Sequence, residues 1–213
     1  MALDLKKSAS SLQVSDGAWG TELQKKGLSA GGAPELMNVQ NPSSVEVVAR
    51  SYVDAGADVI ITNTFGGNRF VLDGHGAGDR AAELCEAGAA ISKKAAGDDA
   101  LVFGSIGPTG KIVMMEEVSP QRLTAAFTEA AEALQWGGVD AIVLETFNEL
   151  DEARIALQAC KTAVDLPVIV SMTFSSGPDK TATMMGNKPA DLAKMANREG
   201  AAAVGANCGC GPD

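Results

Sequence analysis

The clearest pattern in the chain is a recurring segment in which a glycine precedes a short apolar run that ends in a polar residue. The segment occurs at residues 55–64, 137–146 and 199–208. A glycine just past a helix can adopt the left-handed conformation that ends it. An apolar run without alternation is typical of a strand buried on both faces, as in a parallel sheet. Each segment therefore predicts a helix end followed by a parallel strand.

The same pattern extends to six strands that alternate with five helices. Strands are expected at residues 12–15, 57–62, 101–105, 141–145, 167–173 and 202–206, and helices at 43–55, 79–96, 120–136, 149–163 and 189–199. Asn41 and Ser119 stand where capping residues belong, each followed by a proline suited to the first helical turn. This alternation predicts an α/β protein with a mostly parallel sheet, which is either doubly wound or a barrel.

Two observations favour the (β/α)8 TIM barrel. No Gly-x-Gly-x-x-Gly segment follows the first strand, which disfavours a dinucleotide-binding doubly wound sheet. Polar residues follow many different strands, as catalytic groups do around the rim of a barrel. The fold usually needs eight units in about 250 residues, so the 213 residues account for about six of the eight. We expect an N-terminal segment at residues 1–11 and one C-terminally incomplete barrel domain at residues 12–213.

Charge and hydropathy exclude several classes of partner. The chain has 17 Lys and Arg against 27 Asp and Glu, a net charge of −10 that disfavours nucleic-acid binding. No apolar stretch approaches the roughly 18 residues that a membrane helix needs, and the N-terminus lacks the pattern of a signal peptide. We therefore expect a cytoplasmic protein with no membrane partner. In a reducing compartment the scattered cysteines do not predict disulfides, and Cys85 and Cys160 are expected to pack in helices.

The residues that follow the predicted strands are the candidates for chemistry. They include no lysine suited to a Schiff base and no histidine, because His75 falls in a glycine-rich loop. This disfavours an aldolase or a histidine-based acid–base enzyme. The candidates include Asp16, Gly17, Thr62, Thr64, Glu145, Thr146, Asn207 and Cys208.

Each candidate also has a simpler interpretation. Asp16 and Gly17 form a common turn dipeptide. Glu145 follows an apolar run and is expected to be partly desolvated, but a salt bridge in the barrel mouth would explain it equally. A lone cysteine such as Cys208 is more often a packed thiol than a metal ligand.

Five motifs that occur in order along the chain favour the functional interpretation over the simpler ones. They are Asp16-Gly-Ala-Trp-Gly-Thr21, Thr62-Asn-Thr-Phe-Gly66, Ser105-Ile-Gly-Pro-Thr-Gly110, Glu145-Thr-Phe147 and Gly205-Ala-Asn-Cys-Gly209. Together they resemble the homocysteine S-methyltransferase family over nearly the whole chain. The likeness is closest to the homocysteine-binding barrel of cobalamin-dependent methionine synthase and more distant to betaine–homocysteine methyltransferase.

The resemblance implies a zinc-dependent transfer of a methyl group to the thiol of homocysteine, which forms methionine. In the family three cysteine thiolates hold zinc, and the metal-bound homocysteine sulfur is deprotonated. The implied roles are Cys208 as a catalytic residue and the first zinc ligand, and Glu145 as the catalytic group that receives the substrate amino group. The implied lining of the amino-acid pocket is Asp16, Gly17, Thr64 and Glu145, with Asn207 beside the metal.

The sequence departs from the family pattern at the other two zinc ligands. The family has an adjacent cysteine pair on a later strand, whereas this chain ends at Asp213 without one, and Cys210 is not at a family ligand position. The chain is then a fragment, which we favour, or is completed by a second polypeptide, or is a degenerate relative. The alternative function is accordingly a non-catalytic barrel remnant that binds a small amino acid or a partner chain.

The resemblance also bears on the methyl donor. The resemblance suggests methylcobalamin on a separate domain or on a corrinoid partner protein, and betaine or S-methylmethionine remain open. A barrel enzyme for a phosphorylated substrate is disfavoured, because the late strands that would bind phosphate are missing from the chain.

Overall fold

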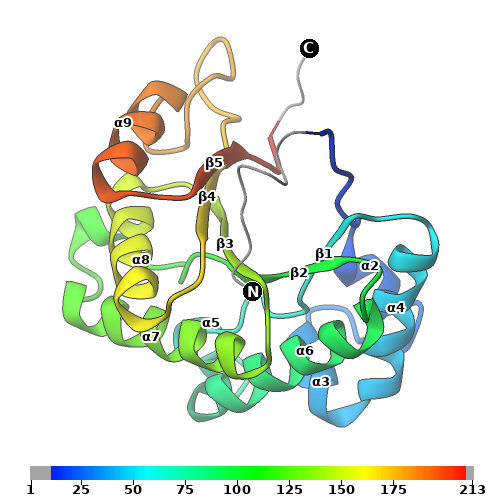
Figure 1. Ribbon diagram of the computed structural model, residues 1–213. Helices are drawn as coiled ribbons and strands as arrows, with labels where there is room; N and C mark the ends of the chain where they lie inside the picture. The colour runs from blue at the N-terminus through cyan, green and yellow to red at the C-terminus, as the bar shows by residue number, and fades with distance from the viewer. Residues whose placement is uncertain (1–10, 210–213) are drawn as a thin grey trace.

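The computed structural model describes residues 11–209, in which helices alternate with parallel strands (Figure 1). The strands are β1 (Val59–Ile61), β2 (Leu101–Ile106), β3 (Ala141–Phe147), β4 (Val168–Met172) and β5 (Ala203–Ala206). The longer helices are α4 (Pro42–Asp54), α6 (Ala81–Ala96), α7 (Pro120–Trp136), α8 (Leu150–Ala163) and α9 (Pro189–Glu199). The shorter elements are α2 (Trp19–Gln24), η1 (Pro34–Leu36), α3 (Met37–Gln40), α5 (Arg69–Asp73), η2 (Gly78–Arg80) and η3 (Val113–Met115).

The five strands form one parallel sheet in the order β1-β2-β3-β4-β5, so each strand pairs with the next one in sequence. Figure 1 shows the strands curving through the middle of the molecule with helices around the outside. A doubly wound sheet would reverse its strand order at a switch point. The sequential order therefore supports the predicted barrel class. Among the described residues the barrel is not closed, because β5 pairs only with β4.

Local signals explain where the long helices begin and end. The side chain of Asn41 accepts a hydrogen bond from the Ser44 N–H at the start of α4, and Ser119 accepts one from the Arg122 N–H at the start of α7. Both helices have proline in the first turn, where no N–H is needed. Gly200 ends α9 with a φ of 73°, in the left-handed region that favours glycine. The caps predicted for α4 and α7 are therefore present.

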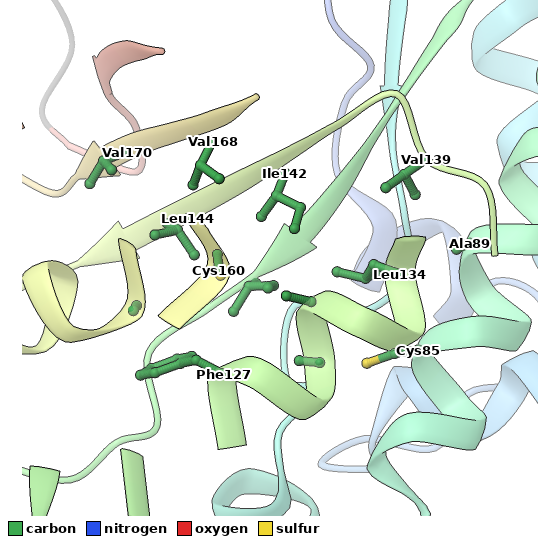
Figure 2. Close-up of a cluster of buried hydrophobic side chains, with 14 of the residues drawn as sticks. Cys85, Ala89, Phe127, Leu134, Val139, Ile142, Leu144, Cys160, Val168 and Val170 are labelled. Atoms are coloured by element: carbon green, nitrogen blue, oxygen red, sulfur yellow. The ribbon is translucent and has the colours of Figure 1, made fainter. Parts of the chain in front are cut away.

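The core lies between the sheet and the helices α6, α7 and α8, as Figure 2 shows. Phe127 of α7 and Phe147 of β3 are fully buried, with ring centroids 6.0 Å apart. Cys85 and Cys160 are buried free thiols within this core, which confirms that they pack. Small alanines on α6, α7 and α8 are buried in the same core.

Burial alternates along part of β2, β3 and β4, which corrects the expectation that both faces of the sheet are buried. Residues such as Ile60, Val102 and Ile142 pack against the helices and are fully buried. Their neighbours face the inside of the open barrel, where no described side chain covers them completely. These half-buried inward residues are Ile61, Phe103, Val143 and Ile169.

The expectation of a regular strand at residues 12–15 was wrong. Only Ser15 forms a bridge, with Val59 of β1. The Val14 N–H donates to the Asp58 carboxylate at 2.8 Å, so a side chain replaces a backbone partner of the ladder. The Leu12 and Val14 side chains are 94% and 58% exposed, and they do not contribute to the core. The segment still lies along β1 and brings Asp16 to the end of that strand.

The remaining differences concern short elements and the chain ends. The sequence pattern did not indicate α2, α3 and α5, which span four to six residues each. Most of the expected N-terminal segment at 1–11 lies outside the described residues, as does Cys210. Within residues 11–209, every helix is too short or too polar to cross a lipid bilayer.

Candidate functional site

One pocket with a volume of about 1060 Å³ opens on the inner face of the sheet. Its floor consists of the inward-facing residues of the strands, and its rim consists of residues that follow the strands. The six site residues expected from the sequence all line this pocket, and Thr62 lines it too. The six are Asp16, Gly17, Thr64, Glu145, Asn207 and Cys208.

Asp16 joins α2 to β1 at the pocket wall. Its Oδ2 accepts hydrogen bonds from Trp19 Nε1 at 2.9 Å and from the Ile61 N–H at 2.9 Å. Burial raises the pKa of Asp16 to about 6, although these two hydrogen bonds oppose the rise. A nearby cation would restore the ionised form. The carboxyl is thus more than part of a turn, because it organises two elements and borders the pocket.

Glu145 lies near the end of β3, with a donor on each carboxylate oxygen. Ser105 of β2 donates to Oε1 at 2.6 Å, and the Asn207 amide donates to Oε2 at 3.1 Å. Burial raises the pKa of Glu145, and the Ser105 hydrogen bond opposes this rise. No Lys or Arg lines the pocket in the described part of the chain, so the structure does not support the salt-bridge interpretation.

Asn207 connects the ends of β3, β4 and β5. Its Oδ1 accepts hydrogen bonds from the Thr146 N–H at 3.0 Å and from the Ser171 hydroxyl at 2.7 Å. Its Nδ2 donates to Glu145 and lies 3.4 Å from the sulfur of Cys208. Cys208 is an exposed free thiol, so the interpretation as a packed thiol was wrong. A carboxylate and a thiol therefore share one amide at the rim.

Gly17 and Thr64 contribute mainly shape. A Cβ at Gly17 would lie 3.1 Å from the Tyr52 hydroxyl, which itself donates to the Ala18 carbonyl. The buried Thr64 hydroxyl donates to the Ser105 carbonyl at 2.7 Å, so its proton is already used within the protein. Both residues therefore shape the pocket wall, and the Thr64 hydroxyl is not free to donate a hydrogen bond to a ligand.

The sequence pattern missed Glu35, a third carboxylate at the pocket. Glu35 is 3% exposed and accepts a hydrogen bond from the Gly66 N–H at 2.6 Å, and burial raises its pKa. Its position after Pro34 looks like that of an ordinary acidic residue in a first helical turn, so no local signal marks it as buried. His75, expected only in a loop, is exposed and also lines the pocket.

The charge and donor set of the pocket limit what it can bind. Its charged lining residues are three carboxylates, Asp16, Glu35 and Glu145, which favour a ligand with a cationic group. Among residues 11–209, no group of three His, Cys, Asp or Glu side chains is placed to hold a metal ion. The described residues alone therefore do not fit a zinc ion, for which Cys208 would be one ligand.

Comparison with known proteins gives a consistent family signal. A family model described as homocysteine S-methyltransferase matches residues 13–213. Methionine synthase from Mycobacterium tuberculosis is 31% identical, across 94% of this chain and 18% of that protein. An S-methylmethionine–homocysteine S-methyltransferase from Pongo abelii is 28% identical, across 94% of this chain and 52% of that protein. The chain thus spans about a fifth and about half of the length of these relatives.

Solved structures show the same fold. The homocysteine methyltransferase MmuM from Escherichia coli in its metallated form gives a TM-score of 0.81 at 21% identity, over 96% of this chain and 77% of that chain. Its apo form gives 0.72 at 22% identity, over 92% and 72% of the two chains. These likenesses support the barrel fold.

Proposed function

This chain belongs to the homocysteine S-methyltransferase family, and we propose that its pocket binds homocysteine as the acceptor of a methyl group. One observation carries the proposal: Asp16, Glu145 and the adjacent pair Asn207 and Cys208 come from three separate segments and border a single pocket. Carboxylates for an ammonium group and a thiol at the same rim are what a sulfur-containing amino acid requires.

In this proposal the amino group of homocysteine binds at Glu145. Ser105 and Asn207 each occupy one acceptor site on the carboxylate and fix its plane, which leaves the remaining lone pairs for the ligand. Burial without a paired cation makes the ionised form costly, and an ammonium ion would offset that cost through a charge-assisted hydrogen bond. Asp16 would add negative charge to the same pocket. Both of its side-chain contacts with neighbouring residues fall on Oδ2, which leaves Oδ1 for the ligand.

The thiol of homocysteine would then lie toward Cys208 at the rim. Zinc dependence is part of the same proposal: Cys208 would be one thiolate ligand, and the other ligands would come from outside residues 11–209. A bound metal would supply the homocysteine thiolate at neutral pH. Support comes from the family and from a structurally similar protein solved in a metallated form. For the methyl donor we propose methylcobalamin on another domain or on a corrinoid partner, with S-methylmethionine and betaine as alternatives.

Isothermal titration with L-homocysteine tests the acceptor site. We expect saturable binding at one site per chain, and binding roughly 10- to 100-fold weaker in Glu145→Gln, because a charged hydrogen bond is worth about 1.5–3 kcal/mol. A Glu132→Gln variant on the outer helix α7 is the matched control, because Glu132 is not among the pocket-lining residues. Equal affinity in wild type and Glu145→Gln would refute the assignment. Binding without methionine formation from any of the three donors would favour the non-catalytic alternative.

A further inference from the structure

Strand β3 contains one extra residue at the pocket. Leu144 pairs with Val170 of β4, and Phe147 pairs with Met172, so three steps along β3 match two steps along β4. This is the signature of a β-bulge, which re-aims side chains next to functional sites. In a regular strand successive side chains point to opposite faces. Here two consecutive residues, Glu145 and Thr146, both line the pocket.

Thr146 has an unfavourable backbone conformation at this bulge. Its φ is 66°, in the left-handed region that a β-branched residue rarely adopts. The Asn207 side chain holds the conformation, because its Oδ1 accepts the Thr146 N–H at 3.0 Å. The Ser171 hydroxyl donates to the same oxygen at 2.7 Å. These two donors also fix which end of the Asn207 amide is the oxygen.

The orientation of Asn207 in turn determines what the Thr146 hydroxyl does. The Asn207 Nδ2 donates to Thr146 Oγ1 at 2.7 Å, so the hydroxyl proton is left for another acceptor. That acceptor is the sulfur of Cys208, 3.6 Å away. Cys208 also has a positive φ, of 53°. Two residues with a positive φ, one in β3 and one just after β5, are thus joined through one hydroxyl.

We propose that Thr146 is a positioning residue that fixes the direction of the Cys208 thiol. A glycine would adopt the same backbone without strain, but it would provide no hydroxyl for the sulfur. The contact between the Thr146 hydroxyl and the Cys208 sulfur explains why a threonine occupies this strained position. The consequence for homocysteine rests on the proposed function. If the Cys208 side chain keeps one rotamer, its sulfur keeps one position relative to the thiol of bound homocysteine.

Nuclear magnetic resonance of a cysteine-labelled chain measures the direction of the Cys208 side chain directly. The background is Cys210→Ser, and Cys208→Ser assigns the signal. We expect Hα–Hβ couplings of a single χ1 rotamer in this background and in Thr146→Ser, which keeps the hydroxyl. In Thr146→Val, which keeps the shape and loses the hydroxyl, we expect averaged couplings. Thr146→Gly relaxes the backbone, so it tests the hydroxyl even if the valine variant folds poorly.

Two outcomes separate the two proposals. A single Cys208 rotamer in both Thr146→Val and Thr146→Gly would overturn the positioning role, whatever the ligand is. Titration with L-homocysteine gives the second readout, for which we expect affinity to fall roughly two- to tenfold in Thr146→Val and to be restored in Thr146→Ser. No homocysteine binding to the wild-type chain would count against the proposed function and leave the rotamer result standing.

Discussion

The buried carboxyl of Asp16 should lower the stability of the folded protein when it is ionised, and a substitution can test this. Asn replaces Asp with almost the same shape, and both of the contacts with neighbouring residues fall on Oδ2. An asparagine oxygen can accept the same two hydrogen bonds, from Trp19 and Ile61. Asp16→Asn therefore removes the charge while it preserves the link between α2 and β1.

The magnitude follows from the pKa of Asp16, which burial raises from 3.8 to about 6. That difference corresponds to about 3 kcal/mol between the neutral and ionised forms. Because the side chain is partly exposed, solvent screening reduces the value to roughly 1–2 kcal/mol. A raised carboxyl pKa means that the folded state binds more protons than the unfolded state between pH 4 and 6. The penalty is therefore absent below pH 4, grows up to pH 6 and is complete above it.

Urea unfolding followed by circular dichroism between pH 3.5 and 8 measures this effect. We expect Asp16→Asn to equal wild type near pH 3.5 and to be more stable by roughly 1–2 kcal/mol above pH 6.5. Asp16→Ala is the control and should be less stable, because Trp19 Nε1 and the Ile61 N–H lose their acceptor. A stability difference between wild type and Asp16→Asn that does not change with pH would refute the reasoning.

Three further substitutions test the core, a close backbone approach and a buried carboxyl. Phe127→Ala should lower the free energy of unfolding by about 3–5 kcal/mol in urea titration, because the ring is fully buried; a loss below 1 kcal/mol would contradict the described core. Gly88→Ala should cost about 1–3 kcal/mol in the same assay, because its Cβ would lie 2.5 Å from Asn38 Nδ2 and 2.8 Å from Thr64 Cγ2. Glu35→Gln should raise thermal stability above pH 7, where the buried carboxyl is costly to ionise, and calorimetry that shows no gain would exclude this cost.

The sequence was most informative where local signals repeat. Helices α7 and α9 begin and end at the predicted residues, because a proline starts each one and a glycine follows each one. Strands β2 to β5 lie within one or two residues of their predictions, since each follows a helix end and consists of a short apolar run. Helices such as α2 and α5 are too short to show a helical period, and the contacts that form them are tertiary.

For the site, strand order was sufficient to bring distant residues together. Asp16, Glu145 and Cys208 were expected at strand ends and border one pocket. The strain at Thr146 was not predictable, because the bulge exists only in the register of β3 against β4. Glu35 was missed for a similar reason, since its burial depends on the loop that carries Gly66.

In the proposed complex, one pocket holds homocysteine with its amino group at Glu145 and its sulfur at Cys208. Mixed-disulfide formation with homocystine, followed by mass spectrometry in a Cys210→Ser background, tests it most directly, because Cys85 and Cys160 are buried. We expect Cys208 to react at least about tenfold faster with L-homocystine than with the D enantiomer, and Glu145→Gln to abolish the preference. Equal rates for the two enantiomers would contradict the claim.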